Sequence, residues 1–392
     1  MARSPIEVAD VLRAHGADFL SSVRGAISSA KRRVLADLQA CRTAALGGHV
    51  DECEDCGHRR VSYNSCRNRH CPKCQGKARA EWLDARMSDL LPVEYFHVVF
   101  TVPEQIAAIA LQNKREVYGI LMRDSAATLK EIAGDPKRLG AEIGFVSLLH
   151  TWGQNLLHHP HVHCVVPGGG LSPGGTRWVS CRPGFFLPVR VLGRMFRGKF
   201  LHSVAAAHRE GRLRFQGGLS HLRDARAFGN VLAECRRANW VVYSKPPFGG
   251  PEQVLKYLAR YTHRVAISNS RLLRMADGNV TFQWKDYAHG GRQRTMTLRA
   301  QEFIRRFLLH VLPKGFPRIR HYGLLGNRSA GLERCRELLA CPPPQPTPKC
   351  GEAGQSGGDD RRCPLCGSTA VVHRELTPHE MLLRARDGID TS

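Results

Sequence analysis

The sequence predicts a mixed α and β (α+β) fold with a small, separate metal-binding module, and three observations support this prediction. Apolar segments with the period of β-strands alternate along the chain with segments of helical spacing, which argues against a helical bundle. Residues 50–75 are rich in Cys, His, Arg and Asn but have almost no aliphatic side chains, so they cannot build a core without a metal. The stretch from Pro342 to Asp360 has the Pro, Gly and Ser content of a linker.

Periodicity places the helices and strands in order along the chain. Residues 1–45 carry apolar side chains at helical spacing and form an amphipathic helical lead-in. The apolar run Tyr95–Thr101 predicts a buried strand. Further strands are expected over residues 143–150, 161–166 and 239–244. Helices are expected over residues 104–133 and 190–210 and around Phe303–Val311.

The charge of the chain indicates its partner. Among 392 residues, 58 Lys and Arg stand against 34 Asp and Glu, which gives a net charge of +24. Such a surface attracts phosphate, so a nucleic acid is expected rather than a small-molecule substrate. No membrane partner is expected, because no long apolar segment is present. The N-terminus lacks the apolar core of a signal peptide, which predicts a cytoplasmic protein with reduced thiols.

The cysteine spacing predicts a zinc site. The pairs Cys53-x-x-Cys56 and Cys71-x-x-Cys74 are separated by fourteen residues, and two tight turns of this kind can present four thiolates to one tetrahedral ion. These four residues are the predicted ligands of one Zn²⁺. The spacing does not exclude three alternative ligands that lie between the pairs, namely Cys66, His58 and His70.

Basic side chains surround the cysteine pairs. Residues 56–80 contain no acid, so a fold held by metal in this region would display positive charge to phosphates. The residues expected to contact DNA here are Arg59, Arg60, Arg67, Arg69 and Lys73, with Lys77 and Arg79 beyond them. The alternative is a solvated basic face without a defined ligand.

A second metal site is predicted from the segment His159-Pro-His-Val-His163. On a strand, the period of two puts His161 and His163 on one face, where their imidazoles converge. Two histidines leave a divalent ion with open positions, which an ion needs if it is to hold a scissile phosphate. Gln154 is the expected third ligand, and its rivals are His150, His158 and His159.

Two tyrosines are the candidate nucleophiles. Pro251 opens a predicted helix, on which Tyr257 and Tyr261 are four residues apart and therefore share a face. A phenol has a pKa near 10, so its attack on phosphorus needs a metal-activated phosphate and nearby cations. The cations expected beside the tyrosines are Lys256, Arg260 and Arg264, with His263.

Taken together, these residues resemble the two-tyrosine rolling-circle transposases of the insertion sequence ninety-one family, which belong to the HUH endonuclease group and carry an N-terminal zinc ribbon. The motifs that carry the resemblance are Arg69-His-Cys-Pro-Lys-Cys-Gln, His97-Val-Val-Phe-Thr-Val-Pro, His150-Thr-Trp-Gly-Gln, His159-Pro-His-Val-His, Tyr257-Leu-Ala-Arg-Tyr, Phe186-Leu-Pro-Val-Arg-Val-Leu and Phe196-Arg-Gly-Lys-Phe. They extend over nearly the whole chain.

The resemblance implies an HUH-type nuclease core, in which a central antiparallel sheet flanked by helices carries the two histidines. It implies a DNA strand transferase and endonuclease that cuts and rejoins single-stranded DNA, both element ends and target, as the transposase of a bacterial insertion sequence. A tyrosine would attack the phosphodiester beside Mg²⁺ or Mn²⁺, forming a 5′-phosphotyrosine link and a free 3′-hydroxyl. The choice of Gln154 as third ligand rests on analogy with this group.

The resemblance also assigns roles to the segments of the chain. Residues 1–48 would be the lead-in, 49–90 the zinc-binding module that contacts DNA, 91–325 the catalytic domain, and 326–392 a linker and tail. In this tail, Cys363 and Cys366 supply half of a second zinc site, which Cys350 and His373 could complete. The alternative is an unliganded or disordered tail.

Three other functions use the same residues differently. A replication initiator or relaxase would perform the same chemistry on another DNA. A non-catalytic zinc-ribbon regulator would bind DNA without cutting it, with its histidines and tyrosines serving only the fold. A metal-independent tyrosine recombinase would use an arginine-rich site in place of a histidine pair.

Overall fold

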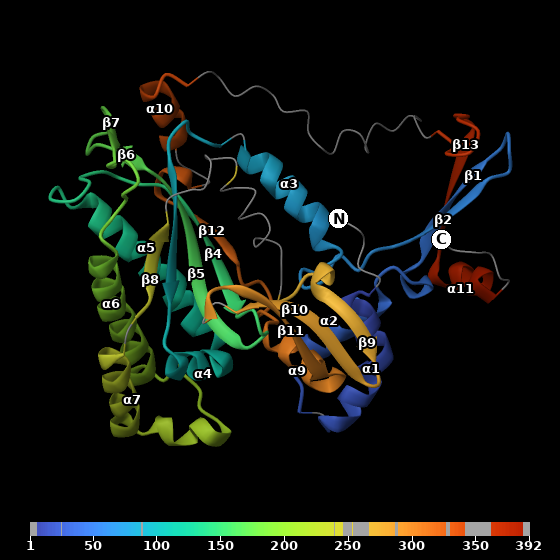
Figure 1. The fold of residues 1–392 in the computed structure, drawn as a ribbon, viewed down its shortest axis with the longest axis horizontal. Helices are drawn as coiled ribbons and strands as arrows, with labels where there is room; N and C mark the ends of the chain where they lie inside the picture. Colours follow the sequence, from blue (N-terminus) through green and yellow to red (C-terminus); the bar gives the residue numbers. More distant parts are fainter. Residues whose placement is uncertain are drawn as a thin grey trace. The chain divides into compact units, whose positions relative to one another are not determined.

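The computed structural model of the chain describes residues 6–24, 26–87, 89–238, 240–245, 253, 266–286, 289–326, 330–341 and 362–386. The chain divides into two compact units, each assembled from separate segments (Figure 1). The first unit comprises Met1–Asp84, His263–Val311 and Pro346–Ser392, and the second comprises Ala85–Thr262 and Leu312–Gln345. The tail after the linker thus belongs with the N-terminal segment, whereas the predicted segments follow one another linearly.

The second unit is built on a five-stranded sheet with the order β12-β4-β5-β3-β8, and each of its strand pairs is antiparallel. Together with the helices around it, this sheet confirms the α+β class. All four predicted strands of this unit are present with slightly different bounds, and β12 is an additional strand. The strands are β3 (Tyr95–Thr101), β4 (Phe145–Trp152), β5 (His158–Pro167), β8 (Val242–Lys245) and β12 (Ile319–Tyr322).

One face of this sheet is packed by helices. Alternate side chains of the central strands, such as Phe96 and Phe100 of β3 and Val162 and Val166 of β5, are buried in the main core. Each such side chain contributes about 1.5–3 kcal/mol of burial free energy, which fixes the face that each strand turns inward. The helices that supply the rest of this unit's main core are α4 (Glu104–Gln112), α5 (Lys114–Gly134), α6 (Val189–Arg209) and α7 (Ala225–Arg237).

Short elements complete the second unit. A smaller apolar cluster joins Leu91, Leu171, Leu324 and Cys335. The remaining elements here are β6 (Gly169–Leu171), β7 (Trp178–Ser180), η2 (Gly217–Arg223), η5 (Gly323–Leu325) and α10 (Gly331–Leu338). Helix α3 (Gln75–Met87) contains the point in the sequence at which one unit ends and the other begins.

The first unit has two three-stranded antiparallel sheets, with the orders β13-β1-β2 and β11-β10-β9. Figure 1 shows the C-terminal strand β13 lying beside β1, from the N-terminal part of the chain. The elements of this unit are α1 (Val8–Ser22), α2 (Ser29–Ala40), η1 (Ala44–Leu46), β1 (Gly48–Cys53), β2 (Arg59–Tyr63), η3 (Asn269–Arg271), β9 (Leu272–Ala276), β10 (Asn279–Asp286), β11 (Arg292–Arg299), α9 (Ala300–Leu309), β13 (Val371–Leu376) and α11 (Pro378–Arg386).

Local sequence explains the ends of several of these elements. The Ser28 hydroxyl caps α2 by accepting a hydrogen bond from the backbone N–H of Lys31. Asp277 and Gly278 both adopt the left-handed conformation, as the two-residue turn between β9 and β10 requires. Among the described helices, none is long and apolar enough to cross a membrane.

Candidate functional site

Three histidines meet on the face of the five-stranded sheet opposite the main core. His161 and His163 alternate on β5 with the buried Val162 and Cys164, and therefore share this second face. His150 of β4 is paired directly with His161 in the strand register. The nitrogen atoms of the three imidazoles that could bind an ion lie within 4.8 Å of one another. The predicted convergence of His161 and His163 is therefore present, and His150 joins the pair.

Hydrogen bonds orient two of these rings. Nδ1–H of His161 donates to the carbonyl oxygen of His159 at 2.7 Å, which leaves Nε2 of His161 to carry the lone pair. Nδ1 of His163 lies 2.6 Å from Nε2 of His97 on β3, and the two rings are stacked. If His163 is the donor in this contact, its Nε2 also presents a lone pair. Partners of this kind fix the tautomer of histidines that bind metals.

Burial keeps these imidazoles neutral. It lowers the pKa of His161 to about 3, with a further contribution from His159. Burial, helped by Lys245, lowers the pKa of His97 to about 4. The pKa of His163 is also lowered well below its ordinary value, first by burial and then by the neighbouring histidines. At neutral pH the rings of His97, His161 and His163 are therefore uncharged, and each keeps one N–H and offers one nitrogen lone pair.

The other predicted third ligands occupy different places. His158 points to the core face, where its Nε2 lies 2.7 Å from the hydroxyl of Tyr118. His159 supplies the carbonyl oxygen that holds His161. Gln154 lies in the turn between β4 and β5, after the last residue of β4. The histidine that the fold brings to the pair is His150, which the sequence offered only as a rival of Gln154.

The candidate nucleophiles Tyr257 and Tyr261 lie outside the described residues, as do Lys256, Arg260, His263 and Arg264. Strand β8, which precedes them in the chain, adds two polar residues to the histidine face. Tyr243 has its ring 6.1 Å from that of His97, and the ammonium of Lys245 lies over the Tyr243 ring. No spacing pattern in the sequence marked His97, Tyr243 or Lys245 as functional residues. His97 lies in the motif His97-Val-Val-Phe-Thr-Val-Pro. Two positions after it is Val99, which pairs with His163 in the strand register.

The predicted single zinc site with the ligands Cys53, Cys56, Cys71 and Cys74 is wrong as a ligand set, because the structure divides these residues between two clusters. The first cluster contains Cys41, Cys66, Cys71 and Cys74, and the second contains Cys53, Cys56, Cys363 and Cys366. The physical reason is that β2 leads the chain away from the turn of Cys53 and Cys56, while β13 pairs with β1 and brings a C-terminal turn beside it. Cys66, named as an alternative ligand, is in the first cluster.

The first cluster has the geometry of a tetrahedral thiolate site. Sγ of Cys41 lies 3.5 Å from Sγ of Cys74 and 3.7 Å from that of Cys71, and the sulfurs of Cys66 and Cys74 are 3.6 Å apart. A tetrahedron with Zn–S bonds of about 2.3 Å has edges of roughly 3.8 Å, whereas a disulfide bond is about 2.0 Å long. The four sulfurs therefore fit one zinc ion.

The basic side chains of the cysteine module differ in their availability to a partner. Arg60 and Arg67 are exposed. Arg59 is also exposed but donates to the Glu52 carboxylate at 2.6 Å, and Lys73 forms an ion pair with Glu7 at 2.7 Å. Burial lowers the pKa of Arg69, which is partly buried. The charges best placed to reach phosphate among these five are therefore those of Arg60 and Arg67.

Comparisons with known proteins agree with this arrangement. Residues 144–331 match a family model described as "Putative transposase", and residues 11–102 match one described as "Transposase zinc-binding domain". "Putative transposase y4qJ" of Sinorhizobium fredii is 56% identical over 385 residues, which cover 96% of each chain. "Transposase for insertion sequence element IS801" of Pseudomonas savastanoi pv. phaseolicola is 28% identical over 356 residues, which cover 88% of this chain and 84% of the relative. No solved structure matches the chain.

Two of the three candidate metal sites lie inside a matched segment, and the third does not. His150, His161 and His163 lie within residues 144–331, and the four residues of the first cysteine cluster lie within residues 11–102. The second cysteine cluster takes Cys363 and Cys366 from beyond both matched segments.

Proposed function

The chain belongs to the IS91 family of transposases, and from this premise we propose that it cuts and rejoins single-stranded DNA through a 5′-phosphotyrosine intermediate in rolling-circle transposition. The observation that carries the proposal is the group of three converging imidazoles on adjacent strands. A purely structural histidine cluster would not need three converging nitrogens, with the rings of His161 and His163 oriented by hydrogen bonds.

The donor set fits a divalent ion with open positions. Three imidazole nitrogens leave two or three positions of a five- or six-coordinate ion for oxygen atoms of DNA or water. Mg²⁺ prefers oxygen ligands throughout, so this set favours Mn²⁺ over Mg²⁺. When bound, the ion would polarise the scissile phosphodiester. We assign His150 as the third ligand in place of Gln154, because His150 is the residue paired with His161.

The residues around the group have supporting roles. The carbonyl oxygen of His159 holds His161, and the contact between Nε2 of His97 and Nδ1 of His163 aims the His163 ring. The ammonium of Lys245, on the same face, adds a positive charge that attracts the DNA backbone. These residues orient ligands and bind DNA, and none of them takes part in bond making.

The nucleophiles are Tyr257 and Tyr261. The phenol oxygen of one tyrosine attacks phosphorus and loses its proton, while the bond from phosphorus to the 3′ oxygen breaks and that oxygen leaves as a 3′-hydroxyl. The 5′-phosphate stays on the tyrosine. Rejoining reverses the step, with a 3′-hydroxyl as the attacking group.

The second tyrosine permits a second cleavage before the first link is resolved, which suits rolling-circle transfer. Lys256, Arg260 and Arg264 would neutralise the phosphate during these steps.

The cysteine module has a separate role. We assign Zn²⁺ to the first cluster, because its sulfur distances fit a tetrahedral site and its residues lie in the zinc-binding segment of the family. The module would hold DNA by its phosphates, chiefly through the exposed Arg60 and Arg67.

The test is covalent capture of DNA. The protein is incubated with Mn²⁺ and single-stranded oligonucleotides from the element ends, labelled on either side of the cut, and then denatured. We expect the label on the 5′-phosphate side of the cut to stay on the protein. Tyr257→Phe with Tyr261→Phe should remove the adduct, whereas the matched control Tyr322→Phe, on the core face of the same sheet, should retain it.

Several outcomes would contradict this proposal. An adduct that survives the double variant and disappears with Tyr243→Phe would place the nucleophile on β8. Binding without any adduct would favour a DNA-binding regulator. Adduct formation that withstands chelation would favour a tyrosine recombinase. Efficient cutting of a replication origin or transfer origin, but not of element ends, would favour an initiator or relaxase.

A further inference from the structure

We propose that Cys53, Cys56, Cys363 and Cys366 form a second zinc site, which fastens the C-terminal segment of the chain to the N-terminal hairpin β1–β2. The four Sγ atoms lie within 4.8 Å of one another. Sγ of Cys53 is 3.6 Å from that of Cys366, and Sγ of Cys56 is 3.6 Å from that of Cys363. These distances match the edge of a tetrahedral zinc–thiolate site, roughly 3.8 Å, and are too long for disulfides.

Two turns of the same construction supply the four ligands. In the first, the N–H of Gly57 donates to the carbonyl of Cys53, and the N–H of Cys53 donates to the carbonyl of His58, both at 2.9 Å. In the second, the N–H of Gly367 donates to the carbonyl of Cys363 at 2.9 Å, and the N–H of Cys363 donates to that of Ser368 at 2.7 Å. The sequence repeats accordingly as Cys53-Glu-Asp-Cys-Gly and Cys363-Pro-Leu-Cys-Gly.

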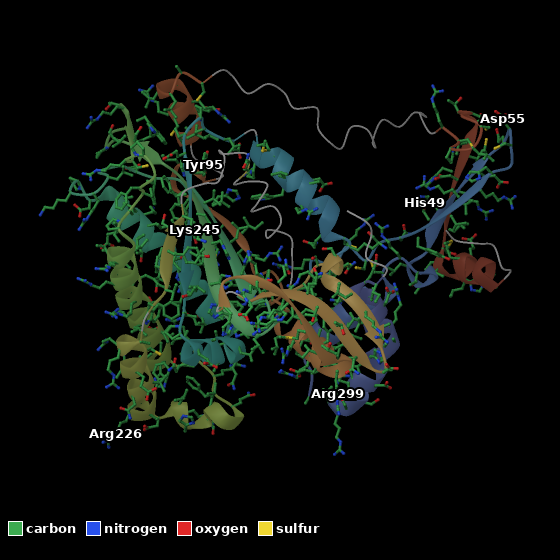
Figure 2. All side chains as sticks on the ribbon, in the orientation of Figure 1. His49, Asp55, Tyr95, Arg226, Lys245 and Arg299 are labelled. Atoms are coloured by element: carbon green, nitrogen blue, oxygen red, sulfur yellow. The ribbon has the colours of Figure 1, made fainter. Side chains whose placement is uncertain are left out.

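The glycines make these turns possible. Gly57 has φ +69° and Gly367 has φ +75°, the left-handed region in which other residues are strained. Each turn therefore directs two thiols to one side of the chain. Figure 2 shows Asp55 at the tip of the β1–β2 hairpin, with sulfur atoms beside it. The hydroxyl of Ser368 donates to the Asp55 carboxylate, which links the two turns directly.

The strand register brings the turns face to face. β13 is antiparallel to β1 and pairs with it from Gly48↔Leu376 to Cys53↔Val371. Glu54 continues the pairing by donating its N–H to the carbonyl of Ala370 at 2.9 Å. The ladder thus ends where both cysteine turns begin. The buried apolar residues that the tail and the hairpin share are Val50, Leu376 and Met381. So small a cluster buries too little surface to hold the tail without a metal.

The surroundings suit the charge of the site. Four thiolates around Zn²⁺ carry a net charge of −2, which nearby cations stabilise. A pocket of about 180 Å³ beside the cluster is lined by Cys53 and Cys363, by the cations Arg60 and Arg362, and also by Asp51 and His58. His373, which the sequence offered as a ligand of this site, instead has Nδ1 2.6 Å from the Asp51 carboxylate. Cys350, the other residue offered, lies outside the described residues.

Zinc stoichiometry tests the ligand set. We use the full chain with His161→Ala and His163→Ala, so that ions at the histidine group are not counted. We expect two zinc ions per chain, and one after Cys363→Ser with Cys366→Ser. Cys53→Ser with Cys56→Ser should also leave one. Replacing all four should again leave one, because the four residues share a single ion. The matched control Cys181→Ser with Cys341→Ser, from outside both clusters, should keep two.

Two results would overturn the site. If the chain binds one zinc and Cys363→Ser with Cys366→Ser leaves that number unchanged, the tail holds no zinc. If the quadruple variant binds none, the pairs are not ligands of one shared ion.

A cleavable linker tests the fastening itself without a cysteine variant. A protease recognition sequence is inserted between Gly357 and Gly358, and the full chain is purified with zinc and then cleaved. We expect the C-terminal fragment to co-elute with the remainder in zinc and to separate after chelation. Separation in the presence of zinc would contradict the proposal. Equal retention after verified zinc removal would also contradict it, because strand pairing alone would then suffice.

Discussion

The histidine group of one unit and the cysteine clusters of the other differ in how many ligands they offer an ion. His150, His161 and His163 supply three nitrogens, which leaves positions open, whereas each cysteine cluster supplies four sulfurs and fills a tetrahedral shell. An open shell can hold a reacting group, and a closed shell can only hold protein. Under the proposed function, this difference would separate a metal site for cutting from metal sites for folding.

The two kinds of site also differ in what supports them. The histidines stand on strands whose opposite face is packed by a large core, so the sheet exists without an ion. The second cysteine cluster lies beside only a small apolar cluster, so we expect the cysteine turns to depend on the ion for their fold. Loss of an ion should therefore stop cleavage at the first site and unfold the module at the second.

The largest effect is expected from removing ligands of the first cysteine cluster. Cys71→Ser with Cys74→Ser leaves two thiols, too few for a structural site. The loss of binding free energy, on the order of 10 kcal/mol, should unfold the module. Zinc content should fall by one ion, and amides of residues 66–76 should lose protection from hydrogen exchange. Cys181→Ser is the control. Full protection after complete loss of zinc would break the comparison.

The next effect is the loss of cleavage without loss of folding. His163→Ala removes a ligand of the open site, which weakens ion binding and transition-state stabilisation by about 4 kcal/mol, a roughly thousand-fold loss of cleavage rate. Binding of single-stranded DNA and the content of zinc should stay unchanged. The control is His202→Ala, an exposed histidine of the same unit. Wild-type cleavage by His163→Ala would remove the histidine group from the mechanism.

The same contrast explains what the sequence could and could not predict. The strand Tyr95–Thr101 and the shared face of His161 and His163 follow from a period of two, which is local. The partner His150 depends on the β4–β5 register, and this pairing contains an irregularity between His150 and Trp152. Spacing along one strand cannot reveal such a register, and the choice of Gln154 rested instead on its oxygen atom and on analogy with the HUH group.

The cysteine ligands were harder to predict because their partners are distant. Cys56 and Cys363 are 307 positions apart, and only the pairing of β13 with β1 brings them together. Within residues 50–75 the two Cys-x-x-Cys pairs formed a complete set of four, so the spacing rule had no reason to divide them. The repeated glycine after Cys56 and Cys366 was the local signal that these two turns belong together.

A smaller effect is expected at the residue that orients His163. His97→Phe keeps a ring but removes the nitrogen that lies 2.6 Å from Nδ1 of His163. Loss of such a positioning partner typically costs 10–100-fold in metal affinity or activity. The cleavage rate should therefore fall at low Mn²⁺ and recover largely as Mn²⁺ is raised. His97→Gln, which retains a hydrogen-bond acceptor, should lie between wild type and His97→Phe.

The outcome at saturating Mn²⁺ separates positioning from other roles of His97. A loss that Mn²⁺ does not relieve would mean that His97 acts on DNA or on the fold. Thermal unfolding of both variants provides the control for the fold.

The smallest effect concerns the basic side chains of the cysteine module, and it separates holding DNA from cutting it. Arg67 is exposed, whereas Arg59 is held by Glu52 at 2.6 Å. An exposed ion pair is worth only about 0–1 kcal/mol, but Arg59 must give up this pair to contact a phosphate. Arg67→Gln should therefore weaken single-stranded DNA binding several-fold and reduce the salt slope of the affinity by about 1, as for one lost phosphate contact. Arg59→Gln should reduce the affinity and the salt slope by less.

Neither variant should alter the cleavage rate once DNA is saturating, because the histidine group is intact. Equal affinity losses for Arg59→Gln and Arg67→Gln would show that the Glu52 pair opens freely. A lower cleavage rate at saturation in either variant would mean that the cysteine module also takes part in the cutting step.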